Sequence, residues 1–198
     1  MGDSEAYESM EMAILQTFLV CLFALTDALV KPTEGTEAVG DIYKFLNANP
    51  NVWVYNTSEG NKGNITCRRD ILKTITPENI TFERYNNTST GQLLKGKFVN
   101  WNNPEKKAYD AMYVNDTDDN PVTDEVIEYV SRDNHCAVVS VTLMTTVPTV
   151  VLRELRVSEA ILQNGPDEEC KENFKNILKE ASKEAISHYS PTCRAQLN

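Results

Sequence analysis

Residues Glu125–Ser158 read EVIEYVSRDNHCAVVSVTLMTTVPTVVLRELRVS. Three runs rich in Val, Ile, Leu and Tyr are separated here by turn-forming residues, and runs of this length and composition predict β-strands. The strands expected from the pattern are Glu125–Ser131, Cys136–Met144 and Val150–Ser158. Because the segments between them are short, consecutive strands should be direct antiparallel neighbours in a sheet.

The same succession of apolar runs and turn-forming residues continues upstream as far as Asn51. Further β-rich runs are broken there by segments of Asn, Asp, Gly, Thr and Pro, which are typical of tight turns. We expect strands at Val52–Thr57, Cys67–Thr76, Asn79–Tyr85, Leu93–Trp101 and Ala108–Asn115. Eight strands at this regular spacing predict an antiparallel up-and-down barrel or a sandwich, and the short loops favour the barrel. The expected fold class is therefore all-β.

A helix is expected on each side of this β-rich region. The first spans about Thr36–Asn47, places Ile42, Phe45 and Leu46 on one side, and ends before Pro50. It is short and lies directly before the first expected strand.

The second helix follows Gly165. Pro166 stands in its first turn, and three acidic residues follow at the positive end of the helix dipole. The residues on its apolar stripe are Cys170, Phe174, Ile177, Leu178, Ala181 and Ala185. Such a stripe packs against a core, so the helix is expected to lie on the barrel wall. An eight-stranded barrel with a C-terminal helix on its wall is the lipocalin arrangement.

The N-terminal region indicates secretion. Ala13–Leu25 is an uncharged apolar run, too short to cross a bilayer easily, and small residues follow it. We expect residues 1–28 to be a signal peptide and residues 29–198 to form a single domain; the alternative for the run is a buried N-terminal helix. The stretch before the run is acidic, which indicates that Met1 is an upstream start and Met10 or Met12 the initiator.

Composition narrows the range of partners. The chain has 29 acidic and 19 basic residues, a net charge of −10, and removal of the five acids in residues 1–28 leaves −5. A mildly acidic chain without a basic stripe argues against nucleic acid and anionic membranes as partners. No second long apolar run follows the leader, so we expect a secreted monomer without a membrane anchor.

Four of the five cysteines remain once the leader is removed: Cys67, Cys136, Cys170 and Cys193. An even number in a secreted chain predicts two disulfides, with three possible pairings. No Cys-X-X-Cys pair or His cluster accompanies them, and the sequence has no nucleophile elbow and no phosphate loop. We therefore expect no metal, no cofactor, no catalytic residue and no enzymatic activity.

Asn-X-Ser/Thr sequons also predict a secreted glycoprotein. The six sequons begin at Asn56, Asn64, Asn79, Asn86, Asn87 and Asn115. Two of them, at Asn86 and Asn87, overlap, so steric crowding should allow a glycan on only one of these.

Several segments resemble the tick salivary lipocalins, the histamine-binding family of blood-feeding ticks. The resemblance covers nearly all of the mature chain and rests on the order and spacing of short motifs. These are Asp41–Asn47, Trp53–Tyr55, Glu125–Tyr129, Asp133–Cys136, Glu154–Leu155, Cys170–Phe174 and Cys193. The resemblance implies secretion from a salivary gland, a role in immune evasion, and disulfides Cys67–Cys193 and Cys136–Cys170.

The sequence departs from the amine-binding members of that family at two positions. Those members have an Asp directly after the cysteine of the seventh strand and an aromatic residue two places after the Glu of the eighth. Ala137 and Arg156 stand there in this chain, and only Glu154 is retained. An ammonium group in a cavity needs an opposite charge to offset its desolvation. The resemblance therefore implies an amine site that this sequence has largely lost.

Strand alternation predicts the lining of the barrel. If Ala137 faces inward, as the resemblance implies, the rest of its row is apolar, and on the eighth strand Glu154 and Arg156 can form a self-contained ion pair. The resemblance also implies a pocket tyrosine on the fifth strand and aromatic residues on the first. The candidate ligand-binding residues are Trp53, Tyr55, Tyr113, Val139, Val141, Leu143, Glu154 and Arg156.

An apolar tunnel with polar groups at one end suits a small hydrophobic ligand such as a sterol, fatty acid or eicosanoid. We therefore expect a secreted lipocalin that sequesters a host mediator or lipid. Three alternatives stay open: side chains that simply fill the barrel, a scavenger of histamine or serotonin, and a surface that contacts a host immune protein or cell. The sequence alone does not separate them.

Overall fold

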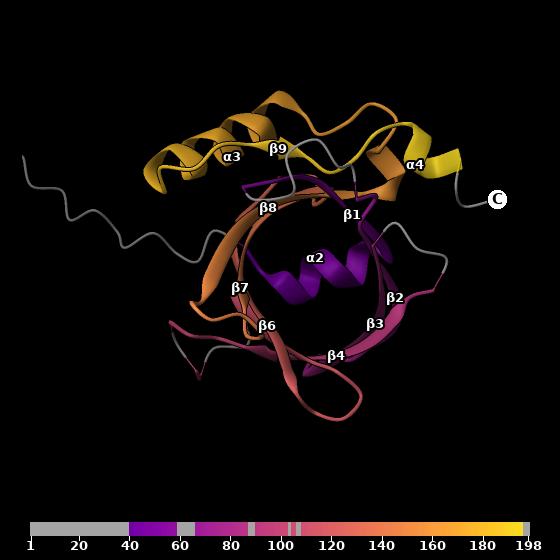
Figure 1. Ribbon diagram of the computed structural model, residues 1–198, viewed down its shortest axis with the longest axis vertical. Helices are drawn as coiled ribbons and strands as arrows, with labels where there is room; N and C mark the ends of the chain where they lie inside the picture. The colour runs from indigo at the N-terminus through magenta and orange to yellow at the C-terminus, as the bar shows by residue number, and fades with distance from the viewer. Residues whose placement is uncertain (1–39, 59–65, 87–89, 103, 106–107, 196–198) are drawn as a thin grey trace, which may run out of the picture. The chain divides into compact units, whose positions relative to one another are not determined.

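Eight antiparallel strands form a closed barrel in the computed structural model (Figure 1). The structure describes residues 40–58, 66–86, 90–102, 104–105 and 108–195, which belong to one unit that spans residues 38–198. The predicted signal peptide, the first residues of the predicted N-terminal helix and the sequons at Asn64 and Asn87 lie outside the described residues. No helix in the described part is long and apolar enough to span a membrane.

The strands follow one another around the barrel in chain order. Strands β2 to β8 are neighbours in sequence, and β1 pairs with both β8 and β2, which closes the ring. This confirms the up-and-down barrel. The bounds are β1 Asn51–Thr57, β2 Arg69–Ile75, β3 Asn79–Tyr85, β4 Gln92–Val99, β5 Ala111–Asn115, β6 Pro121–Val130, β7 Cys136–Leu143 and β8 Val150–Ser158. A two-residue strand, β9 (Ile186–Ser187), extends the sheet beside β1.

Most strand boundaries shift by one to four residues from the prediction, and two of these shifts have a clear local reason. Strand β2 begins at Arg69 and not at Cys67, because Cys67 has a φ of 49°, outside the range of extended backbone. Strand β6 begins at Pro121 and not at Glu125, because its polar first residues still pair with β5 and β7. Polar side chains hid this extension, since the prediction relied on apolar content.

Helix α2 (Ile42–Ala48) closes one end of the barrel. Ile42, Phe45 and Leu46 are buried in the inner cluster, and each such burial contributes about 1.5–3 kcal/mol. The Ile42 amide donates to the Tyr109 carbonyl at 2.8 Å, and the Asn49 side-chain amide donates to the Asn134 carbonyl at 2.7 Å. These bonds tie both ends of α2 to loops at the same end of the barrel.

Helix α3 (Glu168–Glu180) lies on the outer wall. Its N-cap is Asp167, whose carboxylate accepts from the Cys170 amide at 2.7 Å. Cys170, Phe174 and Leu178 are buried in a second cluster, between the helix and the outer faces of β1, β7 and β8. The stripe predicted a helix that continues to Ala185, but it ends at Glu180.

The early end of α3 has a backbone cause. Ser182 has a φ of 53°, a left-handed conformation that stops a helix. The chain then turns back, and β9 pairs with the end of β1. A 3-10 turn, η1 (Glu159–Ile161), and a final short helix, α4 (Thr192–Ala195), complete the described structure.

Two disulfides fasten the C-terminal segment to the barrel. Cys136–Cys170 joins β7 to α3 with a Cα–Cα distance of 6.5 Å, and Cys67–Cys193 joins the chain before β2 to α4 at 5.3 Å. This is the pairing that the resemblance implies. The four cysteines are all buried.

We predict that the native protein has no alkylatable thiol among these four cysteines. The loops closed by Cys67–Cys193 and Cys136–Cys170 span 126 and 34 residues. Loop-closure entropy makes them worth about 5 and about 4 kcal/mol. Replacing the first pair by Ala should therefore lower the free energy of unfolding by about 1 kcal/mol more than replacing the second, in denaturant titrations. Peptide mapping that pairs Cys67 with any residue other than Cys193 would contradict the structure.

Candidate functional site

The inner wall of β7 is apolar. Ala137, Val139 and Val141 are fully buried in the inner cluster with the apolar face of α2, and Leu143 packs against it. Across the β7–β8 ladder, Val141 pairs with Leu152, Val139 with Glu154 and Ala137 with Arg156. The apolar row on one strand therefore faces two charged residues on the next.

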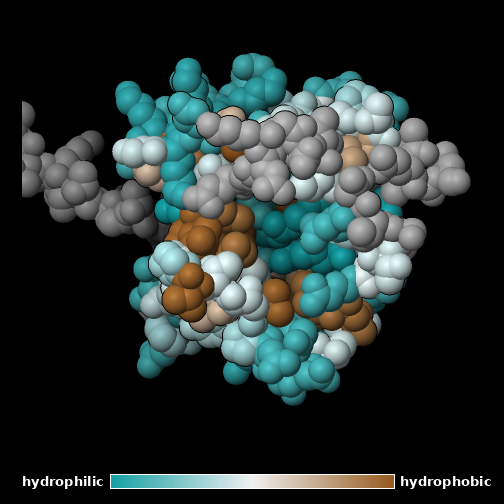
Figure 2. All heavy atoms as spheres, viewed as in Figure 1, coloured by the Kyte–Doolittle hydropathy of each residue, from teal (hydrophilic) through white to brown (hydrophobic). Residues whose placement is uncertain are grey.

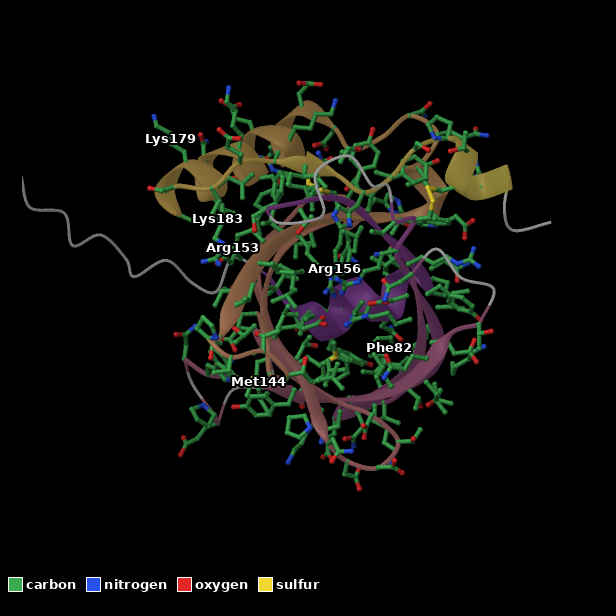
Figure 3. The ribbon with its side chains drawn as sticks, viewed as in Figure 1. Phe82, Met144, Arg153, Arg156, Lys179 and Lys183 are labelled. Carbon is green, nitrogen blue, oxygen red and sulfur yellow. A yellow bond between two sulfur atoms is a disulfide. The ribbon has the colours of Figure 1, made fainter. Side chains whose placement is uncertain are left out.

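Six ionised side chains meet across the middle of the barrel, and we call them the charged belt. They come from the segment before β2 and from strands β2, β3, β6 and β8. The members are Arg68, Asp70, Arg84, Glu125, Glu154 and Arg156. Three positive and three negative groups give the belt a formal charge of zero. Figure 3 shows Arg156 in the centre of the ring and Arg153, from the same strand, outside it.

Arg156 is held by two glutamates. Its Nε and Nη2 donate to Glu154 Oε2 at 3.0 and 2.8 Å, and its Nη1 donates to Glu125 Oε2 at 2.7 Å. The predicted ion pair of Glu154 and Arg156 therefore exists, but it is not self-contained. Each nitrogen of Arg156 already donates to a carboxylate, so Arg156 has a structural role.

Arg84 provides the second set of bonds. Its Nε and Nη2 grip the two oxygens of Asp70 at 2.9 and 2.8 Å, and its Nη2 also donates to Glu125 Oε1 at 2.9 Å. Thr123 donates a further hydrogen bond to Glu125 Oε1 at 2.9 Å. Arg68 donates through Nη1 to Glu154 Oε1. Every carboxylate oxygen of the belt therefore accepts at least one hydrogen bond.

The belt is removed from water. The side chains of Glu125, Glu154 and Arg156 are at most 2% exposed, and those of the other three members are 6–13% exposed. Burial alone raises the pKa of Glu125, but Arg156 and Arg84 outweigh it, and the pKa lies well below the ordinary value. Burial likewise raises the pKa of Asp70 before Arg84 brings it below its usual range.

The aromatic residues predicted to line the pocket do not face the interior. Trp53 lies in the outer cluster, and both Trp53 and Tyr55 pack against Tyr189 of the C-terminal segment. Tyr113 is 40% exposed and accepts a hydrogen bond from Trp101 Nε1 at 2.9 Å. Their strand neighbours, such as Val52 and Met112, take the inward positions, so alternation turns the aromatic rings outward.

Sequence reasoning missed four members of the belt: Arg68, Asp70, Arg84 and Glu125. Part of this was visible in the pattern. Arg84 shares a strand face with Ile80 and Phe82, which are apolar and buried, so alternation points its side chain inward as well. The partners could not be recognised, because the pairs join residues far apart in the chain.

The belt divides the interior into two halves. On the α2 side, Leu72, Ile80, Phe82 and Met112 surround a cavity of about 10 Å³, which is the space needed for one water molecule. A Cβ on Gly96 would lie 2.5 Å from the sulfur of Met112. This half of the barrel is therefore filled.

The half away from α2 is hollow. Figure 2 shows a depression in this end of the barrel, with hydrophilic residues at its floor and hydrophobic residues on its sides. Partly exposed apolar residues at these strand ends are Leu143 and Leu152, which pack against the buried Val114 and Val141 of the inner cluster. A molecule in this half would meet an apolar wall first and the charged belt at the floor.

Comparison with solved structures supports the fold. A protein named AM182, in its serotonin complex, matches with a TM-score of 0.54 and 13% identity over 78% of this chain and 93% of that one. The siderocalin Ex-FABP, described as having dual ligand specificities, matches with a TM-score of 0.53 and 8% identity over 72% and 93%. A bovine odorant-binding protein mutant gives 0.47 and 12% over 70% and 90%.

No protein-family model matches the sequence, and no curated protein is significantly similar to it. The closed barrel with its outer helix has the lipocalin fold. Within the described residues, no group of three or more His, Cys, Asp or Glu side chains could hold a metal ion.

We predict that the belt stabilises the barrel through Arg156. The Arg156→Leu variant leaves two buried glutamates with one partner fewer, which should lower the free energy of unfolding by about 3–5 kcal/mol. Arg153→Leu is the matched control, because Arg153 lies on the same strand but pairs with Glu128 on the half-exposed outer face. Its loss should be about 1 kcal/mol or less. Equal losses in chemical denaturation would contradict a stabilising belt.

The depressed pKa values predict acid sensitivity. A carboxylate whose folded pKa lies below its unfolded value contributes stability above the unfolded pKa and loses that contribution as pH falls towards the folded one. The free energy of unfolding should therefore fall between about pH 5 and about pH 2. In Glu125→Gln this fall should be shallower, whereas the exposed Glu172→Gln should retain the wild-type profile. A steeper fall in Glu125→Gln would disprove the assignment.

Proposed function

We propose that this chain is a secreted binding protein that sequesters a small hydrophobic molecule in the hollow half of its barrel. The observation that carries the proposal is the divided interior. One half is packed around α2, while the other is a depression with apolar walls and a polar floor. Pockets of this composition bind apolar ligands and orient them by a few polar groups.

Two observations support secretion: the disulfides and the exposure of the sequon asparagines. Two buried disulfides suit an oxidising compartment. The sequon asparagines Asn79 and Asn86 are exposed, and Asn56 and Asn115 are partly so. In the setting that the tick resemblance implies, saliva at a bite, the protein would act stoichiometrically on a host mediator such as a sterol, fatty acid or eicosanoid.

An amine is a weaker candidate ligand. Serotonin is bound by the structural neighbour AM182, and an ammonium group in a barrel needs a carboxylate. Here every carboxylate oxygen of the charged belt already accepts a hydrogen bond from an arginine. A cation would have to displace one of these arginines, so we expect histamine and serotonin to bind weakly.

A surface role in contact with a host immune protein or cell is the second candidate. The observation in its favour is the pair formed by Trp101 and Tyr113, which are 49% and 40% exposed and whose rings lie 6.2 Å apart. Exposed aromatic residues are enriched at protein–protein interfaces. A Trp101→Ala and Tyr113→Ala double variant would retain ligand binding but lose the host target if this second function is correct.

We predict that protein purified from eukaryotic cells carries a bound hydrophobic molecule, detected by native mass spectrometry and identified after extraction. Filling the hollow half with Leu143→Trp should reduce the occupied fraction at least tenfold. The matched control is Val147→Trp, because Val147 is in the next loop and fully exposed. Circular dichroism should show both variants folded. An unchanged occupied fraction in Leu143→Trp would rule out this half as the binding site.

A further inference from the structure

Arg68 is the one incompletely bonded member of the charged belt. Its Nη1 donates to Glu154, but its Nε and Nη2 are buried and have no hydrogen-bond partner in the part of the chain that the structure describes. No other atom of the belt is in this state among the described residues. A buried donor without a partner costs about 1–3 kcal/mol, and more if it is charged. The site is therefore incomplete without an acceptor.

The unpartnered atoms have a specific shape. Nε and one terminal nitrogen of a guanidinium form a fork that matches the two oxygens of a carboxylate. Arg84 shows this geometry in the same belt, since its Nε and Nη2 hold both oxygens of Asp70 at 2.9 and 2.8 Å. The same two nitrogens of Arg68 are empty. A carboxylate would give Arg68 the contact that Arg84 already has.

The charges around Arg68 lead to the same conclusion. Arg156 and Arg84 each bond to two carboxylates, whereas Arg68 bonds only to Glu154, which it shares with Arg156. Burial and the nearby Arg84 lower the pKa of the Arg68 guanidinium, and Glu154 and Asp70 offset this only in part. A ligand carboxylate on Nε and Nη2 would stabilise the charged form of Arg68 directly.

The position of Arg68 fits a ligand that enters from the hollow half. It directly precedes the first residue of β2, and its carbonyl accepts a hydrogen bond from the Val54 amide at 3.0 Å, in the middle of β1. Arg156 is the partner of Val54 on the other side of β1, so the two arginines lie at the same level of the sheet. A carboxylate at the floor of the hollow half would therefore bind the unpartnered nitrogens of Arg68 while the bonds of Arg156 stay in place.

We propose that the ligand is a hydrophobic carboxylic acid and that Arg68 binds its carboxylate through Nε and Nη2. The inference rests on the proposed function, since it names the chemical class of the sequestered molecule. The hydrocarbon part of the acid lies against the apolar wall of the hollow half.

The test compares two molecules that differ only in their headgroup. Oleic acid and oleyl alcohol share one chain, and each is titrated into delipidated protein while the heat of binding is measured by calorimetry. The unmodified protein should bind oleate at least tenfold more tightly than the alcohol. Equal affinity for the two overturns the inference but leaves barrel binding intact. Binding of neither molecule, and of no sterol, overturns the proposed function as well.

Substitutions at Arg68 test whether this residue binds the carboxylate of the ligand. Arg68→Gln should weaken oleate at least tenfold and change the affinity for oleyl alcohol less than threefold. Arg68→Lys keeps the positive charge but not the forked pair of donors. Its affinity for oleate should therefore lie between that of the unmodified protein and that of Arg68→Gln. Arg69→Gln is the matched control, because Arg69 stacks on Trp53 and Tyr85 outside the barrel and should bind oleate normally. Wild-type oleate affinity in Arg68→Gln disproves the role of Arg68.

Discussion

The structure depends on keeping six ionised side chains paired inside a protein barrel. Each charge costs several kcal/mol to remove from water, and only close partners with good geometry offset that cost. In this barrel the partners come from different strands: Glu125 on β6 accepts from Arg84 on β3 and from Arg156 on β8. The belt therefore crosses the interior and fixes the register of these strands, because a slip of one residue would turn a charge to the outer face.

The belt also determines what the interior can hold. On the α2 side of the belt, α2 and the apolar side chains around Met112 leave space for about one water molecule. On the other side, the apolar wall ends on a floor of guanidinium and carboxylate groups. The continuous apolar tunnel expected from β7 alone is therefore replaced by a shorter pocket with a polar base. Every carboxylate oxygen of the belt already accepts a hydrogen bond, whereas two nitrogens of Arg68 donate none among the described residues. The floor therefore suits a ligand that accepts hydrogen bonds better than a cation.

The aromatic residues of β1 lie on the outer face of the barrel. Trp53 and Tyr55 pack under the segment that contains α3, β9 and Tyr189, and the two disulfides hold that segment in place. Of the apolar residues of β1, Val52 lies in the inner cluster, whereas Trp53 lies in the outer one and Tyr55 packs against it. The aromatic residues of the first strand thus anchor the C-terminal segment, and the pocket wall is built mostly from aliphatic side chains.

Local properties of the sequence determined the strands, their order and the C-terminal helix, because turn residues and the period of apolar residues depend only on near neighbours. Tertiary structure decided the faces and the partners. Ile127 and Tyr129 are two residues apart, yet Ile127 lies in the inner cluster and Tyr129 in the outer one, because a bulge in β6 between them inserts one residue. No pattern of period two predicts such a reversal. The belt was hidden for the same reason: whether a Glu faces inward, and which Arg it meets, is set by the closure of the ring and not by its neighbours in the chain.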